Sequence, residues 1–280
     1  DMQRNSTSLL QAQCILRALC GFVNKSEAVC GPALGGVGNA ELAAFELLPT
    51  EKRALQLGRG THPLLTFAAS DLYRQANERE GVPYEPDLLA ESCACDPASL
   101  FAAMRGEGPY PVKAFFSVAN NTVMSYANQQ GIVDALMNQD LVVAFEHWLT
   151  PTAQLADYVL PECSYLERRE LPEFVGGRVP VVSLRDQVLE VIHPNTRPAD
   201  VIFTQLAEAC GVGEYFRFGV DELADAQLRT VGLSLEGLRQ AGGTARFPEK
   251  EYSYGAAVKW KTPTGKVQFT SEACEKAGLS

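Results

Sequence analysis

Apolar and polar residues alternate in blocks along residues 112–161, and this pattern predicts a strand–helix–strand unit. Val112–Val118 and Leu141–Phe145 are short apolar runs that each end in a polar loop, as buried strands do. Between them, Ala127–Gln139 carries apolar residues at helical spacing. Parallel strands need such a crossover connection. The pattern therefore predicts an α/β fold with a mainly parallel sheet.

The ends of these two strands predict where a ligand would bind. In open parallel sheets ligands lie beyond the carboxyl ends of the strands, which here means the loops 119–126 and 146–152. Glu146 directly follows a buried strand, where a carboxylate could accept hydrogen bonds from ribose hydroxyls or from the donor edge of guanine. Thr150 or Thr152 could cap the short helix that follows, whose free N–H groups favour a phosphate. Without further information, a simpler interpretation than a binding site is that Glu146 is solvated and that the threonines only cap the helix.

His147 and Trp148, in the second loop, each allow two interpretations. His147 could contact a phosphate or act as an acid or base, but no carboxylate–histidine–nucleophile arrangement accompanies it, so we predict no catalytic histidine. Trp148 could stack on a purine, or it could close the end of the sheet. The chain has three histidines and no HxH or HExxH spacing, so no metal site built from protein ligands is predicted.

The rest of the chain adds predicted helices and strands. Helices are expected over Leu9–Phe22, Ala98–Arg105, Ala199–Cys210, Leu223–Leu228 and Leu235–Leu238. Short strands are expected over Val179–Leu184, Val188–Ile192 and Lys266–Ser271. Asp96 followed by Pro97 fits the start of a helix, and the leucines of the first helix are available for a core. The charge cluster Glu167–Glu170 is interpreted as a solvated face.

Composition excludes several classes of function. The 280 residues carry a formal net charge of −10, which argues against a nucleic-acid partner, because such proteins gather lysine and arginine at their binding surface. No run approaches the ~18 apolar residues needed to span a bilayer, so we expect a soluble chain without membrane insertion. The eight cysteines form no CxxC pair, so neither a zinc site nor an iron–sulfur site is predicted in this stretch.

The segment Asp140–Pro161, DLVVAFEHWLTPTAQLADYVLP, resembles the hallmark segment of the molybdopterin-dependent oxidoreductases of the dimethyl-sulfoxide-reductase superfamily. Weaker similarities to that family lie in the same order around it, at Asp1–Gly21, Ala119–Asn121 and Thr262–Phe269. The motif TPTAxLADYVLPE is similar to the corresponding sequence in the thiosulfate/polysulfide-reductase-like branch.

This resemblance implies a three-layer sandwich that binds a bis(molybdopterin guanine dinucleotide) cofactor with molybdenum or tungsten. Glu146 stands where relatives carry an aspartate that contacts the guanosine, and Asn121 replaces their usual proline. Both changes bear on individual contacts and leave the position of the loops unchanged. The resemblance assigns cofactor contacts to the residues Asn120, Asn121, Ser125, Glu146, His147, Trp148, Thr150 and Thr152.

The resemblance also implies a domain arrangement and partners. Residues 1–240 would form the pterin-dinucleotide-binding domain, with its core at 112–211, and residues 241–280 would lead to a C-terminal barrel domain. A 4Fe-4S cluster and the metal ligand would belong to a domain outside this stretch, so we expect an internal fragment that is inactive and holds no cofactor on its own. The expected partners are the remaining domains, an iron–sulfur electron-transfer subunit and a membrane anchor, in a family whose members often lie outside the cytoplasmic membrane. The alternative is a structural or electron-transfer subunit that keeps the fold without the pterin.

Overall fold

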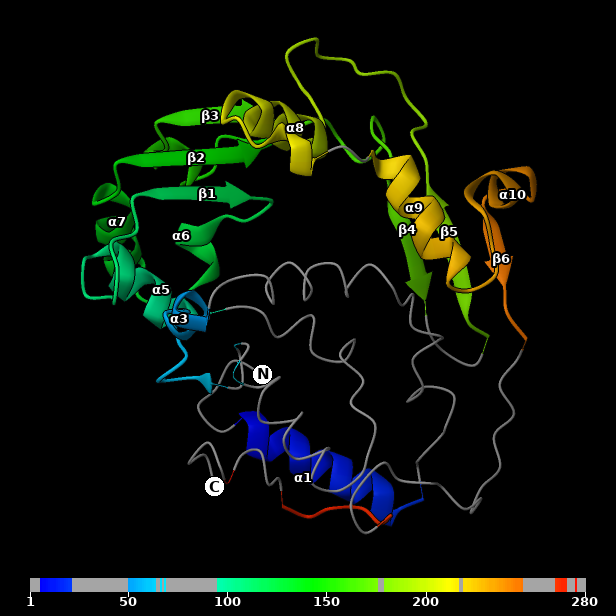
Figure 1. Ribbon diagram of the computed structural model, residues 1–280, viewed down its shortest axis with the longest axis horizontal. Coiled ribbons are helices and arrows are strands. Elements are labelled where there is room, and N and C mark those ends of the chain that lie inside the picture. The colour runs from blue at the N-terminus through cyan, green and yellow to red at the C-terminus, as the bar shows by residue number, and fades with distance from the viewer. Residues whose placement is uncertain are drawn as a thin grey trace.

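A computed structural model describes residues 6–21, 50–63, 66, 68, 95–175, 179–216, 219–248, 265–270 and 275. Its central feature is a parallel sheet of three strands in the order β1-β2-β3 (Figure 1). The strands are β1 (Ala114–Val118), β2 (Leu141–Glu146) and β3 (Tyr158–Pro161). The predicted crossover is confirmed, because β1 pairs parallel to β2 and the helix α7 (Gln129–Met137) connects them. Of the three strands of this sheet, only β3 was not predicted.

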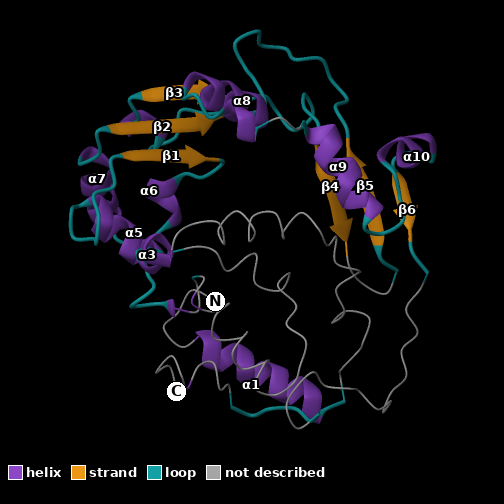
Figure 2. Cartoon of the chain, viewed as in Figure 1, coloured by secondary structure: helices purple, strands orange, loops and turns teal. Residues whose placement is uncertain are grey.

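Helices cover both faces of this sheet, so the predicted three-layer arrangement is confirmed (Figure 2). On one face, Ile132 and Leu136 of α7 pack with Val142 of β2. Successive strand residues point to opposite faces, and on the other face Phe145 stacks on Phe203 with ring centroids 5.0 Å apart. The helices that form these layers are α5 (Pro97–Met104), α6 (Thr122–Ser125) and α7 on the first face and α8 (Ala199–Ala209) on the second.

Local capping chemistry explains where two of these helices begin. The side chain of Asp96 accepts the backbone N–H of Ser99 at 2.8 Å, and Pro97 occupies the first turn of α5, as predicted. Asn128 precedes α7 in a left-handed conformation, φ 63°, and its side chain accepts the N–H of Gly131 at 3.2 Å. Asparagine tolerates this backbone better than most residues do.

A second, antiparallel sheet follows in the chain and was largely not predicted from the pattern. Its strands are β4 (Glu170–Val175), β5 (Val181–Arg185) and β6 (Thr244–Arg246), in the order β4-β5-β6. Two helices pack on it, α9 (Val220–Arg229) and α10 (Leu235–Gln240), around a separate core that includes Val182, Leu228 and Leu238. Figure 1 shows this sheet beyond α8, on the far side of that helix from the parallel sheet.

Several predictions about single segments are wrong. Val188–Ile192 lies in the loop between β5 and α8, where the N–H groups of Val188 and Leu189 donate to the carbonyl of Leu166 instead of to a strand. Residues 266–270 form no strand either. The helix α1 (Ser6–Leu19) forms, but Leu16 is 62% exposed and so adds little to a core.

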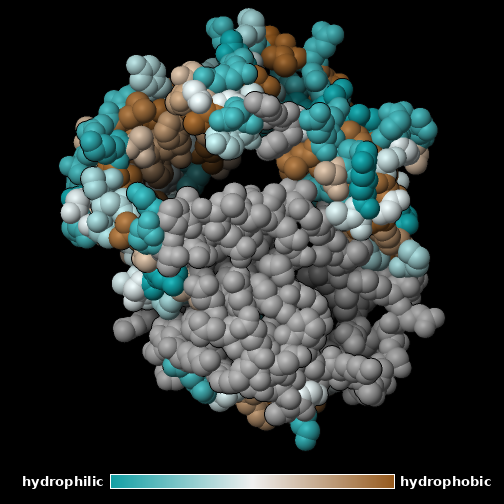
Figure 3. All heavy atoms as spheres, in the orientation of Figure 1, coloured by the Kyte–Doolittle hydropathy of each residue, from teal (hydrophilic) through white to brown (hydrophobic). Residues whose placement is uncertain are grey.

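The remaining elements are short: α3 (Thr50–Ala54) and the 3-10 turns η5 (Ala153–Leu155) and η6 (Gly213–Tyr215). Apolar residues appear on the visible face over both sheet regions (Figure 3). Scattered exposed apolar residues are normal in folded proteins.

Candidate functional site

The two loops predicted to bind a ligand lie side by side at one edge of the parallel sheet. Val118, the last residue of β1, is in register with Phe145 of β2, so the loops that follow the two strands lie at the same edge of the sheet. A side chain joins the loops directly, because the hydroxyl of Thr152 donates to Oδ1 of Asn121 at 2.9 Å. The same hydroxyl accepts the N–H of Val123 at 3.0 Å. The loops therefore form one continuous polar edge.

The first loop is held by its own hydrogen bonds. The hydroxyl of Ser117 donates to the carbonyl of Asn120 at 2.6 Å, and the hydroxyl of Ser125 lies 2.9 Å from both Asn120 Oδ1 and the carbonyl of Asn121. Ala119 has a φ of 52°, which costs a non-glycine residue about 1–2 kcal/mol. Such local strain is concentrated at functional sites. The loop thus presents Asn120, Asn121 and Ser125 in a fixed arrangement.

In the second loop, only one of the two carboxylate oxygens of Glu146 is hydrogen-bonded to another described residue. Glu146 is the last residue of β2, and its Oε1 accepts the hydroxyl of Thr150 at 3.1 Å. Among the described residues, its Oε2 has no hydrogen bond or ion pair. Thr150 also accepts the N–H of Ala153 at 3.2 Å, so Thr150 caps the following turn, whereas Thr152 makes no capping bond. A free carboxylate oxygen at a strand end suits the N–H donors of a guanine.

His147 and Trp148 differ in how firmly they are held. His147 Nδ1 lies 2.9 Å from the backbone carbonyl of Glu162. A carbonyl can only accept, so Nδ1 carries the proton in this bond and the ring is fixed against β3's end. Trp148 is 79% exposed and therefore does not close the end of the sheet. Its ring is accessible to a ligand or to another part of the protein.

A buried ion network lies next to the second loop, and the prediction of a solvated face over Glu167–Glu170 is wrong for all of its residues except Arg169, which is exposed. The guanidinium of Arg168 binds the carboxylate of Glu162, which has only 6% of its side chain exposed. Arg168 also donates to Glu170 from Nε and Nη2, at 2.9 and 2.6 Å, and to the carbonyl of Cys163 at 3.0 Å. The four consecutive charges Glu-Arg-Arg-Glu gave no signal for this burial, because the partner Glu162 lies outside them, just after β3.

Glu167 fixes the loop that precedes α8. Its carboxylate accepts the N–H of Ile192 at 2.7 Å and the N–H of Ser164 at 2.8 Å. These two backbone donors, Ile192 first, hold the pKa of Glu167 below its ordinary value of 4.5. The carboxylate is therefore ionised in the folded protein at neutral pH.

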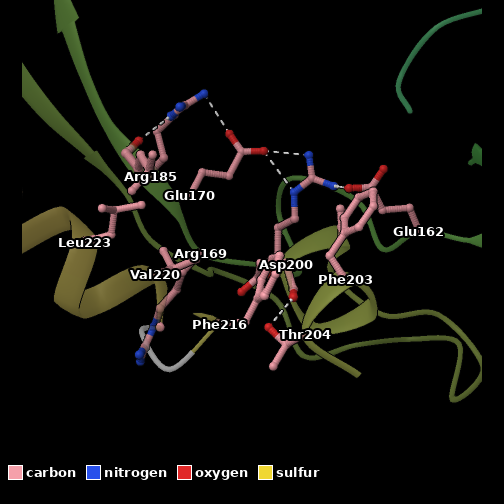
Figure 4. Close-up of a pocket in the computed structure, with 14 residues that line it drawn as sticks. Glu162, Arg169, Glu170, Arg185, Asp200, Phe203, Thr204, Phe216, Val220 and Leu223 are labelled. Atoms are coloured by element: carbon pink, nitrogen blue, oxygen red, sulfur yellow. Dashed lines mark hydrogen bonds and ion pairs between the residues drawn. The ribbon is translucent and has the colours of Figure 1, made fainter. Parts of the chain in front are cut away.

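Two further observations limit what the described residues can do. They contain no group of three or more histidine, cysteine, aspartate or glutamate residues that could hold a metal ion. None of their helices is both long and apolar enough to cross a membrane. A cavity of about 540 Å³ does lie among them, between α8 and the antiparallel sheet, but none of the eight predicted site residues lines it (Figure 4).

Comparisons with known proteins agree with the geometry. The family described as molybdopterin oxidoreductase matches residues 28–208. The acetylene hydratase of Syntrophotalea acetylenica is 40% identical over 285 residues, which cover 99% of this chain and 38% of that protein. The molybdopterin-containing subunit of thiosulfate reductase from Salmonella typhimurium is 31% identical over 194 residues, or 60% of this chain and 25% of that protein.

A solved structure has the same fold as this chain. Acetylene hydratase from Pelobacter acetylenicus superimposes with a TM-score of 0.75 at 37% identity, over 99% of this chain and 38% of that one. The chain thus spans less than two fifths of the length of both acetylene hydratases.

Proposed function

Because the chain belongs to the molybdopterin oxidoreductase family, we propose that its polar edge after β1 and β2 binds the guanosine end of a molybdopterin guanine dinucleotide. The family implies a pterin cofactor with molybdenum or tungsten. The observation that carries the proposal is the 2.9 Å bond between Thr152 and Asn121, which joins both loops into one surface at the ligand-binding edge of a parallel sheet.

Each residue of the edge has a distinct role in this proposal. Glu146 accepts the N–H donors of the guanine with its free Oε2, while Thr150 holds Oε1 in place. Trp148 offers an exposed aromatic face to the guanine, and His147, fixed through Nδ1, presents Nε2.

The amide-rich loop supplies the remaining contacts. Asn120 and Ser125 face the ribose or the phosphates, with Asn121 and Thr152 keeping the two loops at a fixed separation. Amides and hydroxyls can donate to phosphate oxygens without carrying a charge, which fits a chain whose net charge is −10.

The bound pterin supplies the metal at which electron or oxygen-atom transfer takes place. In the whole protein we propose anaerobic redox or oxygen-atom transfer, with the remaining domains, an iron–sulfur electron-transfer subunit and a 4Fe-4S cluster as partners. This chain alone is proposed to supply cofactor binding without turnover.

A second candidate reaction for the whole protein is the addition of water to an unsaturated substrate. The 40% identity to an acetylene hydratase across 99% of the chain favours it. Assays of the whole protein with acetylene and with thiosulfate separate the two candidates, because hydration needs no net electron donor and thiosulfate reduction does.

A titration with guanosine diphosphate tests the proposal for this chain. Trp148, one of two tryptophans, lies in the proposed site, so its fluorescence reports binding. We expect the chain to bind guanosine diphosphate weakly and to prefer it over adenosine diphosphate, because adenine presents no paired N–H donors to Glu146. Glu146→Gln should weaken guanosine diphosphate binding by roughly 10- to 150-fold, the value of hydrogen bonds to a charged group of about 1.5–3 kcal/mol.

A matched control is Glu173→Gln, which makes the same change on an exposed position of β4. This variant should bind both nucleotides as the unaltered chain does. Equal affinity for the two nucleotides, or an equal effect of the two substitutions, would contradict the proposal.

A further inference from the structure

The cavity between α8 and the antiparallel sheet is separate from the polar edge described above. Its volume of about 540 Å³ is within the ~300–1,000 Å³ typical of small-molecule sites. One wall comes from α8, and the facing wall comes from α9 and the start of β4 (Figure 4). The chain therefore has a second concave site for which the proposed function gives no use.

Four of the six charged side chains that line the cavity neutralise one another. Arg168 binds the carboxylates of Glu162 and Glu170. Arg185 binds the other oxygen of Glu170 at 2.7 Å and donates to a backbone carbonyl at 3.0 Å. This group of two arginines and two glutamates has no net charge. An anionic ligand that separated these pairs would leave the buried Glu162 or the partly buried Glu170 without its partner.

The remaining two charges differ from each other. Arg169 is paired with Asp221 at 2.8 Å, and Asp221 is also bound by Arg239. The carboxylate of Asp200, in contrast, has no hydrogen bond or ion pair to any residue that the structure describes. Among the described residues that line the cavity, the one charge without a charged side-chain partner is therefore negative.

Aromatic and aliphatic side chains line the same cavity as this carboxylate. Asp200, Phe203 and Thr204 are spaced i, i+3 and i+4 along α8, so they share the face that lines the cavity. Phe216 adds a second ring, and Figure 4 shows both rings among the residues around the cavity. The facing wall is aliphatic, with Val220 and Leu223.

We propose that this cavity binds a small organic cation, an ammonium group attached to an apolar body. The ammonium pairs with Asp200, and it is attracted by the ring of Phe216 and by the face of Phe203 that is not stacked on Phe145, as aromatic rings attract cations. The apolar body packs against Val220 and Leu223. A neutral ligand of the same shape cannot form the ion pair, and an anionic ligand is repelled by the carboxylate of Asp200.

Calorimetric titration of the full chain with three probes of similar size tests the proposal. The probes are 2-phenylethylammonium, the neutral 2-phenylethanol and the anionic 3-phenylpropionate. We expect the ammonium to bind at least about tenfold more tightly than either of the others, a ratio that corresponds to about 1.4 kcal/mol. Its affinity should fall as the salt concentration rises, since Asp200 is exposed at the cavity wall.

Three variants locate the binding. Asp200→Asn should remove the preference for the ammonium probe, and Val220→Phe, which fills the cavity, should weaken all binding. Glu208→Gln removes one negative charge from the same helix outside the cavity and should change nothing. Circular dichroism confirms that each variant is folded.

The proposal is overturned if the three probes bind alike, if none of them binds, or if Asp200→Asn and Glu208→Gln have the same effect. None of these outcomes bears on guanosine diphosphate binding, because no cavity residue belongs to the polar edge.

Discussion

Replacing Arg168 by methionine should destabilise the protein more than the loss of any surface ion pair. Methionine keeps the apolar stem but removes the guanidinium that binds Glu162, Glu170 and the carbonyl of Cys163. Glu170 keeps a partner in Arg185, at 2.7 Å. Glu162 keeps no side-chain partner among the described residues.

The expected loss of stability follows from the burial of the two paired side chains. The side chains of Arg168 and Glu162 are 18% and 6% exposed, so the substitution leaves a carboxylate with little water and no counter-charge. Breaking a buried pair in this way costs about 3–5 kcal/mol. For a domain of this size class, that lowers the Tm by roughly 6–20 °C.

Guanidinium chloride unfolding, followed by circular dichroism, measures the change. The matched control is Arg229→Met, because Arg229 pairs with Asp225 at 2.6 Å on the exposed face of α9 with 75% of its side chain exposed. That pair should be worth only about 0.3–0.5 kcal/mol. Adding Glu162→Gln to Arg168→Met removes the unpaired charge and should recover part of the loss.

The reasoning is refuted if Arg168→Met lowers the free energy of unfolding by no more than Arg229→Met does. It is also refuted if Glu162→Gln lowers the stability of the Arg168→Met variant further, since the buried charge would then not be the source of the cost.

Three further predictions concern single side chains. Thr152→Val keeps the shape but leaves Asn121 without its donor, so denaturant unfolding should show a loss of about 1–3 kcal/mol together with weaker guanosine diphosphate binding. Because the pKa of Glu167 is lowered in the folded state, by the N–H of Ile192 first, its stabilising effect is present above pH 4.5 and is lost as the pH falls through the lower folded value. Glu167→Gln should therefore reduce the acid dependence of unfolding below pH 4.5, and an unchanged slope there would contradict this. Asp96→Ala removes the cap of α5 and should cost about 0.5–2 kcal/mol by thermal unfolding, whereas no loss would show that the cap is redundant.

The local pattern predicted those parts of the fold whose contacts are close in sequence. The crossover from β1 through α7 to β2 could be predicted because Ile132 and Leu136 recur at helical spacing between two apolar runs, and that spacing is the cause of their packing on Val142. The cap at Asp96 could be predicted for the same reason, since its partner Ser99 is three residues away.

The antiparallel sheet could not be predicted in this way, because its pairing is long-range. Val182 pairs with Ala245 of β6, 63 positions later, and no local period encodes that register. The burial of Arg168 could not be predicted for a different reason: its partners Glu162, Cys163 and Glu170 lie within six residues of it, but no helical or strand period relates these positions. At the candidate site, the sequence predicted the two loops but not the bridge between Thr152 and Asn121, because the resemblance assigned both residues to cofactor contacts and no local period relates side chains 31 positions apart.

The position of a bound guanine nucleotide tests the central claim most directly. Amide chemical shifts of the ¹⁵N-labelled chain, recorded as guanosine diphosphate is added, report which backbone groups sense the nucleotide. The account predicts the largest changes at Asn120, Asn121 and residues 146–150, with adenosine diphosphate producing smaller ones. Changes centred on the cavity at Thr204 and Gly219, with none at the ends of β1 and β2, would contradict it.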